Sequence, residues 1–155
     1  MNYPHFFAID ASSYEDNAHP IALAWSMKDG AIKTTLIQPE DDWTEWDFAL
    51  QDMHGINQET LFQMGETVWS VIRELENDLQ SPLLHCDDDV RSDALLEKLY
   101  EACGRDVSLE TQHHLEEAPK EFVPSQWIDD TDFHHQPCDE RVRLMLMLWV
   151  DFNQK

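Results

Sequence analysis

Asp10 is the first residue whose type and position in the sequence could do chemistry. It directly follows the apolar run at 6–9. A carboxylate at the end of a buried strand is a usual place for a metal-binding acid in α/β folds, because ligands bind beyond the carboxyl ends of the strands. The alternative is structural, since the same side chain could cap a neighbouring turn.

Further acids and histidines lie in short clusters along the chain. The acidic run at 87–89 follows the apolar pair at 83–84. It lacks the spaced ligands and the glycine of an EF-hand loop, so it is more typical of a solvated loop than of a calcium site. Histidine lies beside cysteine or histidine at 85–86, 113–114 and 134–138. These places lack the paired short spacings of structural zinc, and we expect no zinc there.

Three strands are expected around Asp10. The apolar run at 6–9 is the first of them. The turn Lys28-Asp29-Gly30 separates an apolar run at 20–27 from an alternating segment at 31–37. An Asp-Gly pair between such segments favours a hairpin, because glycine tolerates the positive φ that the turn needs.

The rest of the chain alternates predicted helices with short strands. Apolar residues recur at spacings of three and four in the helical segments, and polar caps or glycines mark their ends. The predicted helices are 47–54, a short one from 57, 65–79, 94–103 and 139–152, and the predicted strands are 83–84 and 107–109. Ser92 or Asp93 is the expected N-cap before 94, and Asp139 that of the last helix. The polar, proline-broken segment 111–137 receives no assignment. This order indicates an α/β domain with a mixed sheet and helices on both faces.

Length and composition indicate a single domain over residues 1–155 with one substantial core. No stretch approaches the ~20 apolar residues of a membrane span, so we expect no membrane contact. The first residues carry neither a basic end nor a long apolar segment, so we expect no secretory signal. The three cysteines lack paired spacing, which favours reduced thiols and a cytoplasmic location.

The charge of the chain is its least ordinary feature. It has 32 acidic and 10 basic residues, a net charge of −22. Nucleic-acid binders usually carry a basic patch, because lysine and arginine displace counterions from phosphate. Here the bases lie scattered, so we expect weak nucleic-acid binding or none. The acids form either a highly soluble, salt-adapted surface or a face for a basic protein partner.

Several motifs occur in a fixed order along the chain. They are Asp10-Ala11-Ser12-Ser13, His19-Pro20-Ile21-Ala22-Leu23-Ala24-Trp25, Pro39-x3-Trp43-x2-Trp46-Asp47, His54-Gly55-Ile56, Leu83-Leu84-His85 and His134-x4-Asp139. Together they resemble the DEDDh 3′–5′ exonucleases, the relatives of proofreading exonuclease and oligoribonuclease, and above all a small bacterial branch of stand-alone domains. The resemblance spans about residues 6–149. It implies a ribonuclease H-like fold, with a mixed five-stranded sheet and helices on both faces.

The resemblance also implies a catalytic site. In this family four carboxylates hold two divalent cations, Mg²⁺ or Mn²⁺, and a histidine removes a proton from the attacking water. The motifs match His134 to that histidine and Asp139 to the fourth acid. The first two acids of the family lie at i and i+2, on one face of the first strand. Here Asp10 is one of them, and either Ala8 or Ser12 stands where the other is expected.

The third metal-binding acid of the family also has no direct match. The alignment places Ser92 there, with Asp89 and Asp93 close by as replacements. The resemblance therefore implies a degenerate site with His134 as the catalytic residue and with metal ligands drawn from Asp10, Asp139 and these two acids.

We therefore expect an exonuclease-like domain that lacks two-metal catalysis, is catalytically inactive and acts through binding or assembly. No cofactor is expected unless the site binds Mg²⁺ or Mn²⁺. The first alternative is a weak or altered metal-dependent 3′–5′ exonuclease. The second is an acidic decoy that occupies the basic site of a nucleic-acid-binding protein. The expected partner is a protein of unknown identity, and the apolar last helix would also suit a homodimer contact.

Overall fold

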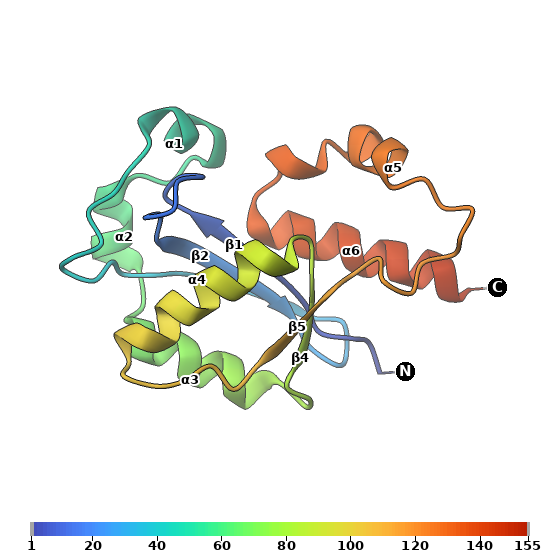
Figure 1. Cartoon of the computed structure of the whole chain (residues 1–155), viewed down its shortest axis with the longest axis horizontal. Helices are drawn as coiled ribbons and strands as arrows, with labels where there is room; N and C mark the ends of the chain where they lie inside the picture. Colours follow the sequence, from blue (N-terminus) through green and yellow to red (C-terminus); the bar gives the residue numbers. More distant parts are fainter. Residues whose placement is uncertain (1, 155) are drawn as a thin grey trace.

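A five-stranded mixed sheet forms the centre of the protein (Figure 1). The structure is a computed structural model that describes residues 2–154. The strands are β1 (Phe6–Ala11), β2 (Pro20–Ser26), β3 (Ile32–Leu36), β4 (Leu83–Cys86) and β5 (Glu110–His113), in the spatial order β3-β2-β1-β4-β5. β1 runs antiparallel to β2 and parallel to β4, so β1 and β4 end at the same edge of the sheet. The predicted mixed five-stranded sheet is confirmed.

Helices cover both faces of this sheet. They are α1 (Phe48–His54), α2 (Gln58–Met64), α3 (Val68–Asp78), α4 (Asp89–Ala102), α5 (Pro124–Thr131), the 3₁₀ turn η1 (Phe133–His135) and α6 (Cys138–Asn153). The buried residues of α3 and α4 share one core cluster with the sheet, and those of α6 share a second cluster. In β1, successive side chains alternate between the two clusters, as the pleat of a strand requires: Phe7 and Ile9 face one, Phe6 and Ala8 the other.

The hairpin of β2 and β3 forms where the sequence predicts it. Gly30 has a φ of +89°, and its N–H donates to the Met27 carbonyl oxygen at 2.9 Å. Every residue of β2 is buried, because the strand lies between β1 and β3 with a core on each face.

The helix at 47–54 is also confirmed: Asp47 caps α1, and Gly55 ends it in the left-handed conformation.

The predicted start of α4 is wrong. The helix begins at Asp89, and its N-cap is Asp88 rather than Ser92 or Asp93. Asp88 Oδ1 accepts a hydrogen bond from the backbone N–H of Arg91 at 3.0 Å. The acidic run after β4 is therefore not a free loop, because the Asp88 carboxylate caps the first turn of a helix.

The predicted strand at 107–109 is also wrong, since β5 lies directly after it. Glu110 of β5 pairs with Leu83, and the remaining residues of both strands follow in parallel register. β5 is a polar edge strand, and its position is decided by backbone hydrogen bonds to β4 rather than by apolar side chains.

The segment 111–137, which the sequence leaves unassigned, contains α5 and η1. Aromatic contacts fold it back toward α6: Trp127 packs on Phe133 with ring centroids 5.0 Å apart, and Phe122 packs on Phe152 at 5.0 Å. α6 begins after Pro137, so Asp139 is not its N-cap but an exposed residue of its first turn. No helix within residues 2–154 is long and apolar enough to cross a membrane.

Gly65 ends α2 with no room for a side chain. A Cβ there would meet the Leu61 carbonyl oxygen and would lie 2.6 Å from the backbone nitrogen of Gln38. We expect Gly65→Ala to lower the free energy of unfolding by about 1–3 kcal/mol, because both neighbours are backbone atoms that must move.

Gly104 provides the matched control. A Cβ at Gly104 would meet nothing within 4 Å, although its φ is +67°. Gly104→Ala should cost about 1–2 kcal/mol from the left-handed backbone alone. Urea unfolding of both variants measures the two losses. A Gly65→Ala protein that is as stable as the unchanged chain would contradict the expected clash.

Candidate functional site

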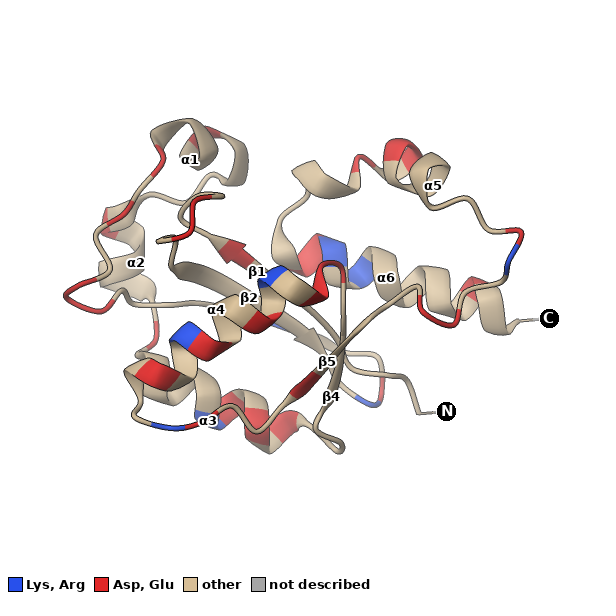
Figure 2. Cartoon of the chain, in the orientation of Figure 1, with Lys and Arg blue, Asp and Glu red and all other residues tan. Residues whose placement is uncertain are grey.

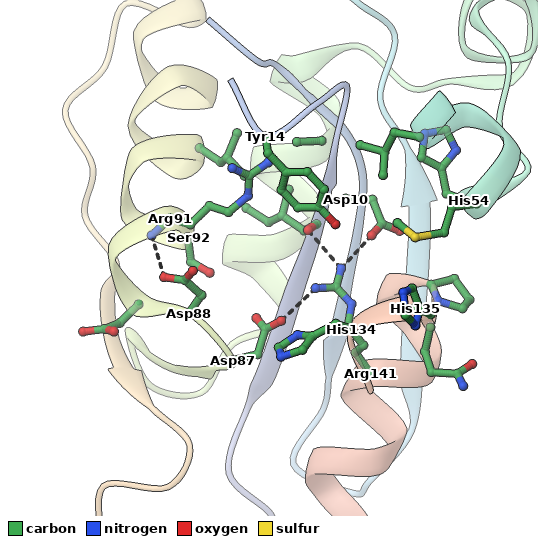
Figure 3. A pocket seen from close by; sticks show the side chains of 18 of the residues that line it. Asp10, Tyr14, His54, Asp87, Asp88, Arg91, Ser92, His134, His135 and Arg141 are labelled. Carbon is green, nitrogen blue, oxygen red and sulfur yellow. Dashed lines mark hydrogen bonds and ion pairs between the residues drawn. The ribbon is translucent and has the colours of Figure 1, made fainter. Parts of the chain in front are cut away.

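A cleft of about 430 Å³ opens where β1 and β4 end (Figure 3). The ends of these strands contribute its floor. α1, the first turns of α4 and the segment around η1 contribute its walls. The polar residues that line it are Asp10, Tyr14, His54, Asp87, Asp88, Asp89, Arg91, Ser92, His113, His134, His135, Gln136 and Arg141. This is the edge at which ligands bind in open α/β sheets, so it is the candidate functional site.

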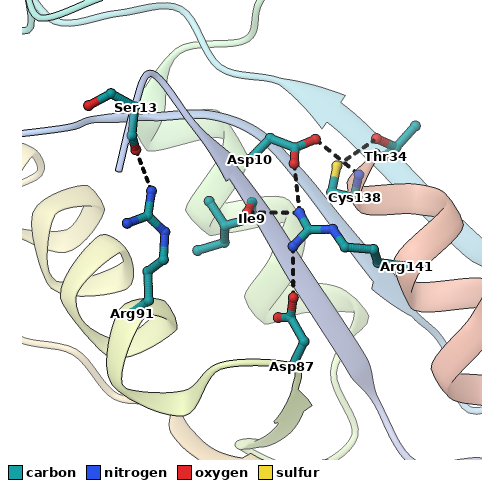
Figure 4. A network of polar contacts seen from close by, with 8 residues as sticks. All are labelled: Ile9, Asp10, Ser13, Thr34, Asp87, Arg91, Cys138 and Arg141. Atoms are coloured by element: carbon teal, nitrogen blue, oxygen red, sulfur yellow. Dashed lines mark hydrogen bonds and ion pairs between the residues drawn. The ribbon is translucent and has the colours of Figure 1, made fainter. Parts of the chain in front are cut away.

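Arg141 of α6 lies between two carboxylates of this cleft (Figure 4). Its Nη2 donates to Asp10 Oδ1 at 2.6 Å and to the Ile9 carbonyl oxygen at 3.0 Å. Its Nη1 donates to Asp87 Oδ2 at 2.7 Å. The side chains of Asp10, Asp87 and Arg141 are only 12–14% exposed. They form one largely buried set of charge-assisted hydrogen bonds, which we call the Arg141 network.

The charges within the Arg141 network stabilise one another. Burial by itself lowers the pKa of the Arg141 guanidinium, but Asp87 and Asp10 outweigh burial and raise that pKa above its ordinary value. Burial raises the pKa of the neighbouring Cys138 thiol well above its ordinary value, and Asp10 raises it further. The arginine therefore stays charged, and Cys138 stays a thiol that is neither nucleophile nor thiolate ligand.

Asp10 also fixes the start of α6. Its second carboxylate oxygen, Oδ2, accepts a hydrogen bond from the backbone N–H of Cys138 at 3.0 Å. Cys138 is the first residue of α6, where N–H groups lack partners within the helix and a negative charge is favourable. Asp10 thus joins the end of β1 to the start of α6 and to Arg141 one turn later.

The structure brings some of the predicted site residues together and separates others. Asp10, Asp89 and His134 line the cleft, with Asp89 half-buried at the start of α4 and His134 exposed on η1. Asp93 lies outside the cleft and accepts a hydrogen bond from a threonine of β5. Asp139 lies outside it as well, on the exposed side of the first turn of α6.

The three positions where the resemblance expects further acids are buried. Ala8 is fully buried in the cluster that faces α6. Ser12 is fully buried too, and its hydroxyl donates to Glu45 Oε1 at 2.6 Å. Ser92 lines the cleft with 4% of its surface exposed. Asp10 is therefore the one carboxylate that β1 supplies to the cleft.

The Arg141 network does not fit the two cations that the resemblance implies. A cation that bound both Asp10 and Asp87 would lie beside the guanidinium nitrogens that already contact them. Two like charges about 4 Å apart repel by several kcal/mol at the effective dielectric of such a site. Within the described part of the chain, no three histidine, cysteine or acidic side chains are grouped so that they could hold a metal ion.

Sequence reasoning missed Arg141 and the role of Asp87. A signal for Arg141 was present, because Cys138, Met145 and Leu148 lie on the buried face of α6 and Arg141 falls on the same face by helical spacing. An arginine on the apolar face of a helix requires a buried acid as its partner. No comparable signal marks Asp87, because three acids in a row do not show which one points inward.

Comparisons with known proteins identify the fold. No family model and no curated protein matches the chain. Solved structures of E. coli Exonuclease I do match. For the complex with a dA16 oligonucleotide, the TM-score is 0.62 at 14% identity, over 74% of this chain and 28% of that chain. For the metal-free form of the ExoI–ssDNA complex, the TM-score is 0.72 at 11% identity, over 99% of this chain and 40% of that one.

The zinc-bound form of the ExoI–ssDNA complex gives the same TM-score of 0.72 at 11% identity, over 96% of this chain and 40% of that chain. The chain thus spans between 28% and 40% of the length of these exonuclease structures. At such low identities the likeness establishes the fold. The protein has an exonuclease-like, ribonuclease H-like fold, as the sequence motifs imply.

Proposed function

We propose that this protein is an exonuclease-like module that acts by binding a partner and does not hydrolyse nucleic acid. The observation that carries the proposal is the position of Arg141. Its guanidinium contacts Asp10 at 2.6 Å and Asp87 at 2.7 Å, at the edge of the sheet where the resemblance expects metal ions. The module would therefore keep the fold of a nuclease, with the Arg141 guanidinium in the place of bound metal ions.

A guanidinium does not supply the chemistry that metal ions supply to a nuclease. Bound divalent cations lower the pKa of a water molecule and stabilise the attacking and leaving oxygens. The Nη atoms of Arg141 already donate to Asp10, Asp87 and the Ile9 carbonyl oxygen. Because Arg141 has no acceptor atoms and a pKa far above neutrality, it neither coordinates a water nor takes a proton from one.

We expect no Mg²⁺- or Mn²⁺-dependent digestion of single-stranded DNA or short RNA. Gel analysis of end-labelled oligonucleotides with the full chain, with and without each cation, measures this. Digestion that needs the cation and disappears in His134→Ala would overturn the proposal in favour of a metal-dependent 3′–5′ exonuclease. Digestion that survives His134→Ala but disappears in Asp10→Asn would overturn the proposal as well, whereas digestion that both variants retain unchanged comes from a contaminating nuclease.

The charge of the molecule favours a second candidate, an acidic decoy of a nucleic-acid-binding protein. Acids spread over α3, α4 and α5 and over several loops (Figure 2). Some of the basic side chains already form salt bridges within the molecule: Lys33 pairs with Glu74, and Arg105 pairs with Glu76. A decoy would bind basic proteins through charge alone, so its binding would weaken steeply as salt is raised.

A further inference from the structure

The mouth of the cleft carries apolar side chains that the fold leaves exposed. Tyr14 is 67% exposed, Val90 is 77% exposed and Met53 is 40% exposed. Tyr14, Met53 and Leu50 line the cleft itself. Val90 lines an adjoining depression of about 410 Å³, which shares Tyr14 with the cleft. We call Tyr14, Leu50, Met53 and Val90 the rim.

One wall of the cleft is a helix with no buried face. α1 has no buried residue, although it contains three large apolar side chains, and Phe48 is 66% exposed. A helix this short is marginal in water by itself, and most helical stability in proteins comes from packing an apolar face. The apolar side of α1 therefore lacks the cover that such a helix usually has.

The charge available around the rim is negative. Asp88 and Asp89 line the cleft, and Glu15 and Asp16 line the adjoining depression. The nearby cations are engaged within the molecule. The guanidinium of Arg141 is held in the Arg141 network.

Arg91 and Lys98, the other cations of these two surfaces, are engaged by the loop after β1. Arg91 donates to the Ser13 carbonyl oxygen and lies over the Tyr14 ring, 5.0 Å from its centroid. Lys98 donates to the carbonyl oxygens of Asn17 and Ala18 at 3.2 and 3.0 Å. These cations fix that loop and hold Tyr14 in place, which leaves the acids to a partner.

We infer that the rim and the cleft dock a segment of a partner protein in which lysine or arginine stands beside an apolar side chain. The inference rests on the proposed function, because only a cleft without metal ions leaves Asp88 and Asp89 to a cationic side chain. The apolar side chain packs against Tyr14, Met53 and Val90. The cation pairs with the two aspartates.

The same features exclude the two other occupants. A nucleic-acid strand would bring phosphates against the aspartates of the cleft, while the arginines and the lysine of these two surfaces are already engaged within the molecule. A second copy of the chain carries the same excess of acids, so two copies repel each other at this acidic surface.

Selection of a library of short random peptides on the immobilised full chain tests the inference. We expect the enriched peptides to combine lysine or arginine with a neighbouring leucine, isoleucine, phenylalanine or tryptophan. Titration of these peptides should show an affinity loss of about tenfold or more in Tyr14→Ser/Val90→Ser and in Asp88→Asn/Asp89→Asn. Asparagine caps a helix as well as aspartate does, so the second variant removes charge and keeps the start of α4.

Matched variants elsewhere on the surface provide the control. Trp69 is 56% exposed on α3, and Asp129 and Asp130 belong to α5. Trp69→Ser and Asp129→Asn/Asp130→Asn should leave peptide affinity unchanged. The melting temperature of each variant shows that the fold is intact.

Several outcomes would overturn the inference. One is the absence of enriched peptides. Another is the enrichment of basic peptides that lack apolar residues and bind the rim variants as well as the unchanged protein, which is the result expected of an acidic decoy. A third is an oligonucleotide dissociation constant tighter than ~10⁻⁶ M at physiological salt that the rim variants abolish. A fourth is a dimer in sedimentation that Tyr14→Ser dissociates. Metal-dependent digestion would instead overturn the proposed function itself, so the two failures are distinguishable.

Discussion

Arg141→Met should be much less stable than the unchanged protein and should respond to divalent cations, which the unchanged protein should not. The variant leaves the carboxylates of Asp10 and Asp87 buried, 14% and 12% exposed, without their counter-charge. Removal of one partner from a buried ion pair typically costs about 3–5 kcal/mol. Methionine keeps most of the volume of the arginine stem, so the loss reports the charge rather than a cavity.

Divalent cations should restore part of this stability. Without the guanidinium, the Asp10 and Asp87 carboxylates that it joined have no counter-charge, and carboxylate oxygens suit Mg²⁺ or Mn²⁺ as ligands. A ligand that binds only the folded form raises the melting temperature in proportion to the logarithm of its concentration. Thermal unfolding of Arg141→Met over a series of Mn²⁺ concentrations should therefore show a rise, which the further change Asp10→Asn should abolish.

Arg143→Met is the matched control on the same helix. Arg143 pairs with Glu140 at the surface, and its side chain is 48% exposed. Exposed pairs of this kind contribute about 0–1 kcal/mol, so the stability of the variant should be close to that of the unchanged protein. Its melting temperature should not change with Mn²⁺ concentration. If the unchanged protein gains several degrees in Mn²⁺ while Asp10→Ala does not, a cation enters the native cleft and the internal role of Arg141 is wrong.

The second large effect is the loss of stability at acidic pH. His114 follows β5 and is stacked among aromatic rings, with centroids 5.1 Å from His113, 5.6 Å from Trp127 and 6.3 Å from Phe133. Burial, with smaller contributions from His113 and His85, lowers the pKa of His114 to about 3 from an ordinary value of 6.5. Below pH 6.5 the unfolded chain therefore takes up a proton at this position that the folded chain does not take up.

The sign of the effect follows from that difference. The free energy of unfolding falls as pH falls through the interval from 6.5 to about 3, by at most about 1.4 kcal/mol per pH unit from this residue. We expect His114→Phe to keep the aromatic stack and to remove this slope. Between neutral pH and pH 5, the variant should lose about 1–2 kcal/mol less stability than the unchanged protein does.

Urea unfolding at several pH values measures the slope directly. Trp127→Phe is the control, because it alters the same aromatic cluster without a titratable group. It should lower stability by a similar amount at each pH. Equal slopes for His114→Phe and the unchanged protein would show that His114 is not buried in its neutral form.

Local sequence determined the elements whose signals lie within a few residues. Asp-Gly at 29–30 set the hairpin, because glycine alone takes the positive φ of that turn without strain. Apolar residues at helical spacing set α3, whose buried residues are Val68, Val71, Ile72 and Leu75. Ordered motifs along the chain gave the fold, which the comparison with solved exonucleases confirmed.

Elements whose position depends on distant partners were placed wrongly or not at all. β5 has a polar sequence, so its pairing with β4 could not be distinguished from a loop, while the apolar segment just before it resembled a strand. α5 has no buried residue, and its eight residues contain only two large apolar side chains, Trp127 and Ile128. Contacts with other parts of the chain hold both of them.

The candidate site divides in the same way. The sequence by itself placed Asp10 at the end of a buried strand and showed that neither neighbour at i±2 is an acid. Only the tertiary structure decided what Asp10 binds, because Arg141 is 131 residues away along the chain. A carboxylate at a strand end suits a metal ion and a guanidinium equally well, and the choice is made by which helix packs beside the strand. Here α6 brings Arg141 to that place, and this contact is why the carboxylate of Asp10 has an internal cation as its partner.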